Sequence, residues 1–354
     1  MYDINFFMKS YGFMKDAEAG KITSGDAAFK TLESMRSRDP IVYNIETTNA
    51  CNMRCQMCPR TTMMTRPNET MPLELFRQVV DQLKPHSADS WRTWEQFVLK
   101  NYSIAPNDMS ENHFFLLIIP KVIQLHGYGD PLLDKNMSEH VKLLADRGFQ
   151  SYFSCNPSNI NIDKATEMFD NGLSYIKYSI ETVDDDIHKA IRGKASDFTE
   201  SYQKILKLLE IKKKNNYETV IVITMLDLNR DKQAEDYAKL MSAFEGKDVY
   251  IYLKSEDQQW YRKDYHGTKS VHWSEFCKHA WMSMTIKSNG EAAMCMEDFD
   301  NEIVLGDTRQ ESLNNIWNGV KYHKFRQDHF EVTPGLKCTE RCDMTMIGEL
   351  IVNK

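Results

Sequence analysis

The sequence has no long hydrophobic run and no excess of basic charge. Its longest strongly apolar stretch, Phe114–Ile119, has six residues and ends at Pro120, whereas a helix that spans a membrane needs about 20. The 44 lysines and arginines are outnumbered by 51 aspartates and glutamates, so the net charge is −7. We therefore expect no membrane span and no nucleic-acid partner.

The N-terminus lacks the basic segment and apolar stretch of a secretory signal, so we expect a cytoplasmic protein. In that reducing compartment, cysteines usually bind metals or serve catalysis rather than form disulfides. The chain has eight cysteines, and their spacing is therefore the most informative feature of the sequence.

Residues 41–254 alternate between β-branched or aromatic segments and segments of helical periodicity. The expected strands are 41–48, 121–126, 150–154, 174–180, 218–225 and 248–253. This alternation predicts an α/β fold with a parallel sheet and helices outside it. Six such strands can form an open doubly wound sheet or a partial barrel, and periodicity alone does not choose between them.

The rest of the chain divides into segments of different character. We expect residues 1–40 to form an N-terminal helical extension and 85–119 to be a partly helical insertion that either caps the barrel mouth or forms an oligomer surface. The polar and aromatic residues 255–276 indicate a linker, and 277–354 a small cysteine-rich domain with only short strand or helix signals.

Cys51, Cys55 and Cys58 form a Cys-x3-Cys-x2-Cys motif directly after the first expected strand. In α/β folds, the loops that follow the strands carry the functional site. Structural zinc needs a fourth ligand, and the nearest histidine is His86. A disulfide does not use three thiols, and the loop is too polar for buried structural thiols. A four-iron cluster fits better, because three cysteines leave one iron open to bind a substrate.

Residues 49–60, Asn-Ala-Cys-Asn-Met-Arg-Cys-Gln-Met-Cys-Pro-Arg, resemble the signature of radical S-adenosylmethionine (AdoMet) enzymes. The resemblance extends over about residues 41–342 and implies a partial (β/α)6 barrel. It implies that AdoMet binds the open iron of a [4Fe–4S] cluster through its amino and carboxylate groups. It also implies that an electron, from a donor such as flavodoxin or ferredoxin, cleaves AdoMet to a 5′-deoxyadenosyl radical that abstracts a substrate hydrogen atom.

Further positions resemble the segments with which this family binds AdoMet. Gly127-Tyr128-Gly129-Asp130-Pro131 follows the second strand, where the family has Gly-Gly-Glu-Pro; aligned on the proline, Tyr128 replaces the first glycine and Asp130 the glutamate. Taken alone, this segment would be a turn, Ser179 a helix cap and Arg192 a solvated surface residue. The resemblance implies AdoMet contacts among Met57, Gly127, Tyr128, Gly129, Asp130, Asn156, Ser179, Arg192 and Met225.

A second group of cysteines lies near the C-terminus and consists of Cys277, Cys295, Cys338 and Cys342. Structural zinc uses shorter paired spacings, and only the last two of these cysteines are close in sequence. The segments 290–295, 305–307 and 312–318 resemble the C-terminal extensions called SPASM and twitch domains. Four cysteines imply one fully ligated auxiliary [4Fe–4S] cluster, as in the shorter twitch domain of 2-deoxy-scyllo-inosamine dehydrogenase-like enzymes, although the family ends in Cys-x2-Cys and this chain in Cys-x3-Cys.

A closed cluster has no site for substrate, so it is expected to transfer electrons. The first hypothesis is therefore an oxidoreductase that converts an alcohol of a sugar, cyclitol or similar small molecule to a ketone. The alternative is a peptide-modifying enzyme that cross-links or epimerises residues; these enzymes usually carry a leader-binding domain of about 80–90 residues, longer than residues 1–40. A non-enzymatic metal-binding protein is disfavoured by the incompletely ligated cluster at a strand end.

The catalytic base cannot be chosen from the sequence. Polar residues at strand ends or in the linker are candidates: Glu46, Glu181, Asp227, Lys254, Glu256 and Arg262. Trp260, Tyr261 and His266 are candidates for the substrate pocket or for packing within the linker. Cys155 ends the third strand; a small buried thiol is the favoured interpretation, and a hydrogen-atom donor is the minority hypothesis.

Overall fold

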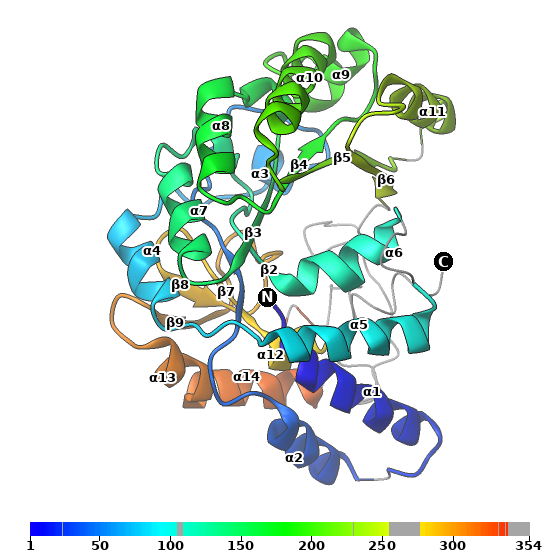
Figure 1. Cartoon of the computed structure of the whole chain (residues 1–354). Coiled ribbons are helices and arrows are strands. Elements are labelled where there is room, and N and C mark those ends of the chain that lie inside the picture. The colour runs from blue at the N-terminus through cyan, green and yellow to red at the C-terminus, as the bar shows by residue number, and fades with distance from the viewer. Residues whose placement is uncertain are drawn as a thin grey trace.

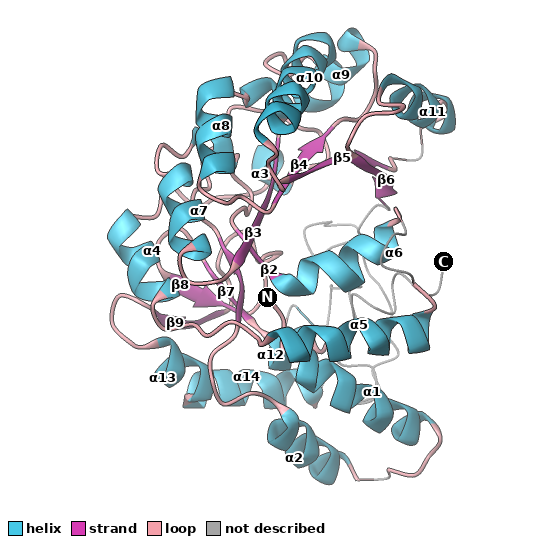
Figure 2. Cartoon of the chain, in the orientation of Figure 1, coloured by secondary structure: helices cyan, strands magenta, loops and turns pink. Residues whose placement is uncertain are grey.

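The structure is a computed structural model that describes residues 1–22, 24–104, 109–228, 230–254, 277–331, 333–336 and 338. One sheet of nine strands runs through it in the order β6-β5-β4-β3-β2-β1-β7-β8-β9 (Figures 1 and 2). The strands are β1 (Val42–Ile45), β2 (Val122–Gln124), β3 (Gln150–Cys155), β4 (Tyr175–Ser179), β5 (Val220–Leu226), β6 (Tyr250–Lys254), β7 (Met284–Ile286), β8 (Glu291–Ala293) and β9 (Val304–Asp307).

The six strands expected from the sequence are all present and pair in parallel from β1 to β6. The sheet is curved, and helices cover its convex side (Figure 1), as expected for a partial (β/α)6 barrel. The helices of the barrel are α4 (Leu73–Val80), α7 (Met137–Ala145), α8 (Ile162–Asp170), α9 (Asp185–Arg192), α10 (Phe198–Asn215) and α11 (Gln233–Ala243).

Strand register assigns side chains to the two faces of the curved sheet, because successive residues alternate between faces. Tyr152, Lys177 and Tyr252 share one face through the pairings of β3 with β4, β4 with β5 and β5 with β6. The ring of Phe114, which precedes β2, contacts Tyr152, Tyr250 and Tyr252. That face is therefore the concave one, and the opposite face packs against the helices.

The insertion at 85–119 contains α5 (Ala88–Tyr102), α6 (Glu111–His113) and the π-helical turn Phe114–Ile118. Its second half does not cap the mouth of the barrel: Phe114 contacts Tyr250, the first residue of β6, so the segment fills the concave face near the amino ends of the strands. Figure 2 shows α6 inside the curve of the sheet. The insertion therefore does not occupy the carboxyl ends of the strands, where the cysteine loop begins.

The cysteine-rich segment has more regular structure than the sequence indicates. β7 pairs in parallel with β1, and β8 and β9 follow as an antiparallel extension of the same sheet. The strands have only three or four residues each, which is too short for periodicity to identify them. The helices that follow or precede them are α12 (His279–Met282), α13 (Leu313–Asn318) and α14 (Val320–Phe330).

The N-terminal extension is helical, as expected, and forms α1 (Ile4–Glu18) and α2 (Gly25–Met35). It packs against both parts of the chain: the N-terminal ammonium donates to the carbonyl of Val42, and the backbone N–H of Asp3 donates to the carbonyl of Met282. Arg36 after α2 reaches Asn318 of α13. These helices therefore join the barrel to the C-terminal segment. No helix within the described ranges is long and apolar enough to cross a membrane.

Candidate functional site

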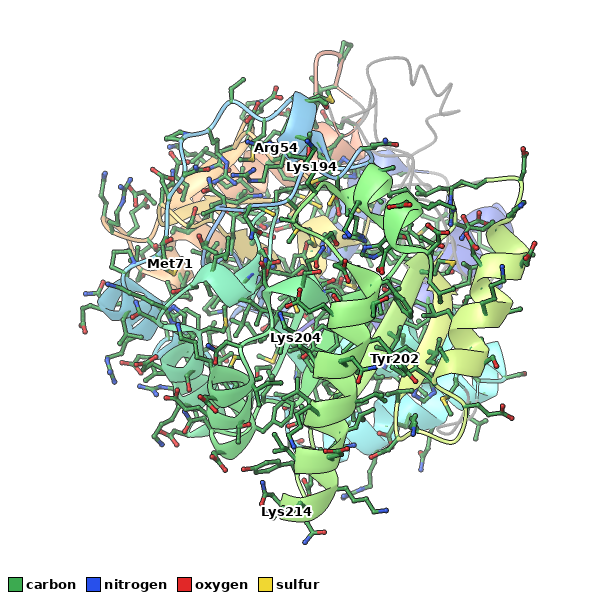
Figure 3. The ribbon with its side chains drawn as sticks, turned by 90° about the horizontal axis from the view of Figure 1, so that it is seen from above. Arg54, Met71, Lys194, Tyr202, Lys204 and Lys214 are labelled. Carbon is green, nitrogen blue, oxygen red and sulfur yellow. The ribbon has the colours of Figure 1, made fainter. Side chains whose placement is uncertain are left out.

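The loop between β1 and α3 (Pro59–Thr62) carries the first three cysteines and docks on the end of α9. The backbone N–H groups of Arg54 and Gln56 donate to the carbonyls of Arg192 and Ile191, both at 2.9 Å. The Gln56 side chain donates to the carbonyl of Ala190. Because the last carbonyls of a helix have no partner within it, the loop satisfies the end of α9. Figure 3 shows Arg54 beside Lys194, just past α9.

Two glycines allow this docking. Gly193 has φ of +99°, and a Cβ there would lie 3.0 Å from the backbone nitrogen of Arg54. Gly129, in the turn after β2, leaves still less room: a Cβ would lie 2.3 Å from the carbonyl oxygen of Thr48. Only glycine fits such close approaches of backbone to backbone. The turn after β2 and the cysteine loop are therefore one packed unit.

Asp130 and Asn156 tie this unit together from within. The Asp130 carboxylate, 3% exposed, accepts hydrogen bonds from the backbone N–H groups of Leu132 and Asn156 and from Asn159. Asn159 in turn exchanges hydrogen bonds with Asn52 of the cysteine loop. Burial raises the pKa of Asp130 despite these donors. The side chain of Asn156 donates to Ser196. The side chains of Asp130 and Asn156 are therefore both hydrogen-bonded within the protein.

Arg192 connects the cysteine loop to the ends of two strands. Its guanidinium pairs with Glu181 and places Nη1 3.8 Å from Sγ of Cys55. The other Glu181 oxygen accepts the backbone N–H of Leu226 at 2.8 Å. Burial opposes the charge of Arg192, but Glu181 and Cys55 outweigh it and hold its pKa above the usual value. With both oxygens occupied, Glu181 is a support for Arg192 rather than an exposed base.

The other site residues predicted from the sequence lie on different faces of the sheet. Ser179 and Lys254 lie on the concave face by register, and the Ser179 hydroxyl is 3.4 Å from that of Ser154. Met225 and Cys155 lie on the helix-facing side and are buried. Asp227 is partly exposed, with its N–H bonded to the Lys254 carbonyl. Met57 is partly exposed on the cysteine loop.

A buried charge network joins the barrel to the C-terminal segment. Glu46, at the end of β1 and fully buried, accepts two hydrogen bonds from Arg66 and two from Ser288. Burial opposes its ionisation, but Lys287 and Arg66 outweigh this and hold the pKa of Glu46 below its ordinary value. Lys287 donates to the carbonyls of residues 296 and 298. Glu46 is therefore engaged in structure, not available as a base.

The described cysteines of the second set are Cys277, Cys295 and Cys338. Cys277 and Cys295 both act electrostatically on Tyr2, whose pKa is raised well above its usual value, chiefly by burial. The N–H of Cys277 donates to His329, and Cys338 is 3% exposed. The fourth cysteine and the linker candidates lie outside the described residues: Cys342, Glu256, Arg262, Trp260, Tyr261 and His266.

Sequence reasoning missed the residues that support these loops. Arg66, Lys287, Asn159 and Glu297 stand in polar or turn-like contexts, where a solvated side chain is the usual interpretation. Nothing in their spacing reveals the partners that they find in the fold; Arg66, for example, donates to the carbonyl of Phe299, which is far away in the sequence.

Comparison with protein families now assigns these two regions. A family model described as the radical SAM superfamily matches residues 110–241, and one described as an iron-sulfur cluster-binding domain, SPASM, matches residues 277–343. The chain therefore contains a radical SAM domain followed by a SPASM domain. The radical SAM domain implies a [4Fe–4S] cluster and AdoMet, and the SPASM domain implies auxiliary iron–sulfur clusters. No curated protein matches the sequence.

Two solved structures with TM-scores of 0.50 or more show the same fold at low sequence identity, and a third is less similar. SuiB of Streptococcus suis has a TM-score of 0.53 at 12% identity, covering 91% of this chain and 79% of that one. The enzyme anSMEcpe with bound AdoMet has a TM-score of 0.50 at 14% identity, covering 84% and 87%. BtrN in complex with AdoMet and 2-DOIA has a TM-score of 0.47 at 15% identity, covering 83% and 89%.

The thiols of the radical SAM loop fit an iron–sulfur group. Burial raises the pKa of Cys51, and that of Cys58 to about 12, so these thiols stay protonated unless a metal stabilises their thiolates. The N–H of Met53 lies 3.4 Å from Sγ of Cys51, a hydrogen bond of the kind that tunes cluster sulfurs. Among the described residues, no three His, Cys, Asp or Glu side chains surround a point as the ligands of a single ion do.

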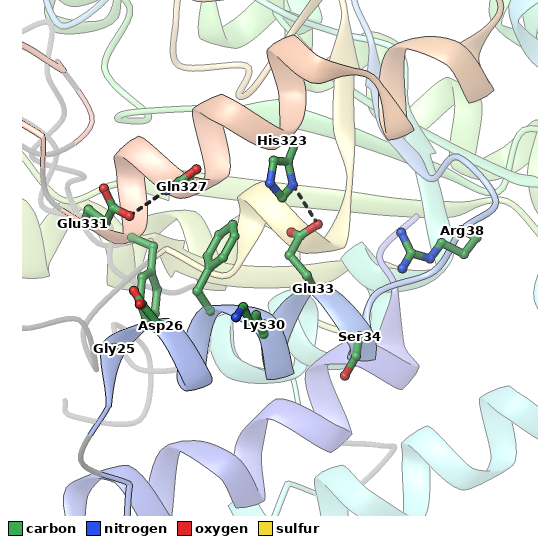
Figure 4. Close-up of a pocket in the computed structure, with 11 residues that line it drawn as sticks. Gly25, Asp26, Lys30, Glu33, Ser34, Arg38, His323, Gln327 and Glu331 are labelled. Atoms are coloured by element: carbon green, nitrogen blue, oxygen red, sulfur yellow. Dashed lines mark hydrogen bonds and ion pairs between the residues drawn. The ribbon is translucent and has the colours of Figure 1, made fainter.

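A cavity lies away from the cysteines. It has a volume of about 790 Å³ and lies between α2 and α14 (Figure 4). Its walls combine charged side chains with the aromatic rings of Phe29 and Phe330, and Nδ1 of His323 lies 3.4 Å from a carboxylate oxygen of Glu33. It is lined by Gly25, Asp26, Phe29, Lys30, Glu33, Ser34, Arg38, His323, Gln327, Phe330 and Glu331. Because no cysteine or strand end contributes to it, it is not the reaction site.

Proposed function

We propose that this radical SAM enzyme is an oxidoreductase that converts an alcohol of a sugar, cyclitol or similar hydrophilic small molecule to a ketone. One observation carries the substrate class: the insertion places Phe114 against Tyr152 of β3 and Tyr252 of β6 and so fills the floor of the concave face. What remains at the carboxyl ends of the strands includes short polar side chains, Ser154 and Ser179. Such a space suits a small molecule with hydroxyl groups better than an extended peptide.

When bound, the radical SAM cluster and AdoMet supply a 5′-deoxyadenosyl radical that removes a hydrogen atom from the alcohol carbon. Completing the oxidation would require a base for the hydroxyl proton and an acceptor for one electron. An auxiliary cluster held by Cys277, Cys295, Cys338 and Cys342 would supply that acceptor. Glu46 and Glu181 are held by protein donors. Asp227 and Lys254, at the ends of β5 and β6, are the proposed groups for moving the proton, because they lie where the strands end. Lys254 shares the concave face with Ser179.

In this proposal Arg192, Ser179 and the turn of residues 127–130 position AdoMet. Backbone groups of the turn face the cysteine loop: the N–H of Asp130 donates to the carbonyl of Ala50 at 2.8 Å. Because the Asp130 carboxylate is already occupied, it shapes the turn and leaves direct contact with AdoMet to neighbouring groups. A one-electron donor such as flavodoxin or ferredoxin would supply the reducing electron.

The alternative is a peptide-modifying enzyme. Its support is the fold, because SuiB and anSMEcpe have been solved with the peptides SuiA and Kp18Cys. Against it, residues 1–40 do not form an independent leader-binding unit here; α1 packs on α5 and α12. These contacts make the extension part of the enzyme's core.

The test uses anaerobically reconstituted enzyme, which is expected to contain about eight irons and eight sulfides per chain if both clusters have four irons. Reduced protein is expected to release 5′-deoxyadenosine from AdoMet, and Cys55→Ala to release none. Aminocyclitols and sugars deuterated at their carbinol carbons are then screened. Deuterium in 5′-deoxyadenosine together with a ketone product supports the proposal. Deuterium transferred only from a peptide, with a cross-linked or epimerised product, contradicts it.

A further inference from the structure

Tyr128 lies at the contact between the two cysteine-bearing parts of the enzyme. Its hydroxyl donates a hydrogen bond of 2.5 Å to Oε2 of Glu297. The backbone N–H of Glu297 lies 3.5 Å from Sγ of Cys295. One residue, Glu297, therefore contacts both the turn after β2 and a cysteine of the SPASM domain.

The turn that carries Tyr128 is fixed on both sides. Gly127 lies against the Glu46 carboxylate, and Gly129 lies against the backbone of Thr48. Because both neighbours are glycines without side chains, Tyr128 supplies the only side chain of the turn between them. Its ring also meets Phe299 edge-to-face, with centroids 5.8 Å apart. The tyrosine is therefore directed at the loop that follows Cys295.

That loop has its own anchors and does not depend on Tyr128 for its position. Lys287 holds the carbonyls of Met296 and Asp298 at 3.0 and 2.7 Å. The N–H of Met296 donates to the hydroxyl of Tyr43, and Arg66 donates to the carbonyl of Phe299 at 2.7 Å. The Tyr128–Glu297 hydrogen bond is therefore one of several contacts to this loop.

We propose that the Tyr128–Glu297 pair couples occupancy of the AdoMet site to the reduction potential of the auxiliary cluster. The inference rests on the proposed function in one respect, that the turn of residues 127–130 contacts AdoMet. The Glu297 carboxylate is a negative charge beside a cluster ligand, and hydrogen bonds and charge near the sulfurs set the potential of such clusters. A charged ligand bound at this fixed turn changes the electrostatic environment of the Tyr128 hydroxyl, and with it the strength of the Tyr128–Glu297 hydrogen bond and the field at Cys295. Tyr128 and Glu297 are positioning residues in this arrangement.

The experiment measures the reduction potential of the auxiliary cluster in the holoenzyme by redox titration monitored by electron paramagnetic resonance, with and without AdoMet. The variants are Tyr128→Phe, which removes only the hydroxyl, and Glu297→Gln, which removes the charge but keeps the backbone N–H. Glu297→Asp keeps the charge and shortens the side chain. Tyr217→Phe is the matched control, because Tyr217 also bonds a carboxylate, Asp170, but on the outer helical layer.

In the wild type and Tyr217→Phe, AdoMet is expected to shift the electron-transfer equilibrium of the auxiliary cluster about tenfold, which is about 59 mV for one electron. Tyr128→Phe and Glu297→Asp are expected to bind AdoMet and lose most of this shift. Glu297→Gln is expected to raise the potential without AdoMet, because removing an anion favours the reduced cluster.

Two results overturn the inference: a wild-type potential that does not respond to AdoMet, or the same response in wild type and Tyr128→Phe. A lower melting temperature of Tyr128→Phe with an unchanged AdoMet response would mark the pair as a domain clamp only. The proposed function fails separately, when reduced wild-type enzyme releases no 5′-deoxyadenosine. The potentials of the cluster are still measurable in that case, so the two failures are distinguishable.

Discussion

The two cysteine regions are held by different kinds of contact. The radical SAM loop is fixed by backbone groups: its N–H groups cap the end of α9, and its chain packs directly on Gly129 and Gly193. The loop after Cys295 is fixed by side chains instead, with Lys287 and Arg66 reaching its carbonyls. Close backbone contacts leave no room for an added atom. A buried charged side chain instead destabilises the protein when its counter-charge is removed.

This difference predicts which substitutions affect each region. Added bulk is expected to damage the radical SAM loop most, and loss of charge to damage the junction with the SPASM domain most. Both regions meet at Glu46, which lies against Gly127 and receives hydrogen bonds from Arg66 and Ser288. Substitutions on either side of this residue therefore test whether the two regions respond differently to added bulk and to lost charge.

The largest effect on activity is expected for Gly129→Ala. The new methyl group would lie 2.3 Å from the carbonyl oxygen of Thr48, so the turn and the cysteine loop must separate. We expect a loss of stability of about 1–3 kcal/mol and, because misplacement by about 1 Å costs roughly 100-fold in rate, a comparable fall in 5′-deoxyadenosine release. Urea unfolding and product analysis by chromatography measure the two effects.

Gly12→Ala is the matched control, since a Cβ at Gly12 in α1 meets nothing within 4 Å. Alanine in a helix interior is expected to stabilise the protein by roughly 0.5–1 kcal/mol. Equal behaviour of the two alanine variants would contradict the close packing of the turn on the loop.

The same contrast explains what the sequence could predict. The six barrel strands and the radical SAM cysteines are local patterns, a run of β-branched residues or a fixed spacing, and the structure confirms the strands. Lys287 and Arg66 form their contacts with residues that are distant in sequence or carry no signal as partners, such as backbone carbonyls. β7 to β9 are too short for a period to appear.

The candidate site shows the same limit at single residues. Glu46 and Glu181 both follow strands, and the sequence therefore ranks them equally with Asp227 and Lys254. Their difference is the set of donors around them, which the sequence does not contain. Arg66 occupies Glu46, while Arg192 and the N–H of Leu226 occupy Glu181.

The largest effect on stability is expected for Glu46→Gln, which leaves Arg66 and Lys287 buried without their anion. Breaking a buried charge pair on one side costs about 3–5 kcal/mol, measurable by urea unfolding at pH 7. Glu74→Gln is the control, because Glu74 and Arg77 form an exposed pair worth at most about 1 kcal/mol. A loss no larger than that of the control would show that side-chain charge does not hold the junction.

The pH dependence follows from the depressed pKa of Glu46. A carboxyl whose folded pKa lies below its unfolded value of about 4.3 stabilises the fold fully above that value. Its contribution is lost as pH falls through the folded pKa. The difference in stability between wild type and Glu46→Gln is therefore expected to shrink on acidification below about pH 4.3, and a constant difference would argue against an ionised Glu46.

A smaller effect is expected for Arg192→Lys. Arginine contacts Glu181 and Cys55 from one planar group, and lysine, with a single ammonium, cannot keep both. We expect a loss of about 2 kcal/mol and an altered paramagnetic resonance signal of the radical SAM cluster. Arg147→Lys is the control, because its partner Asp81 is about half exposed and only a small change is expected there. An unchanged cluster signal in Arg192→Lys would mean that Arg192 serves Glu181 alone.

The smallest effect is expected for Cys155→Ala. This variant tests whether a cysteine outside the two compared regions takes part in the reaction. Cys155 is paired in register with Tyr178 on the helix-facing side of the sheet, is 6% exposed, and has a pKa raised well above its usual value, chiefly by burial. A thiol on that side does not face the concave surface, so it cannot donate a hydrogen atom to a substrate there. We expect a stability loss of about 1 kcal/mol, with unchanged 5′-deoxyadenosine release and product stereochemistry. A product of altered configuration in Cys155→Ala would instead place this thiol in the reaction, and the concave face would then not contain the whole site.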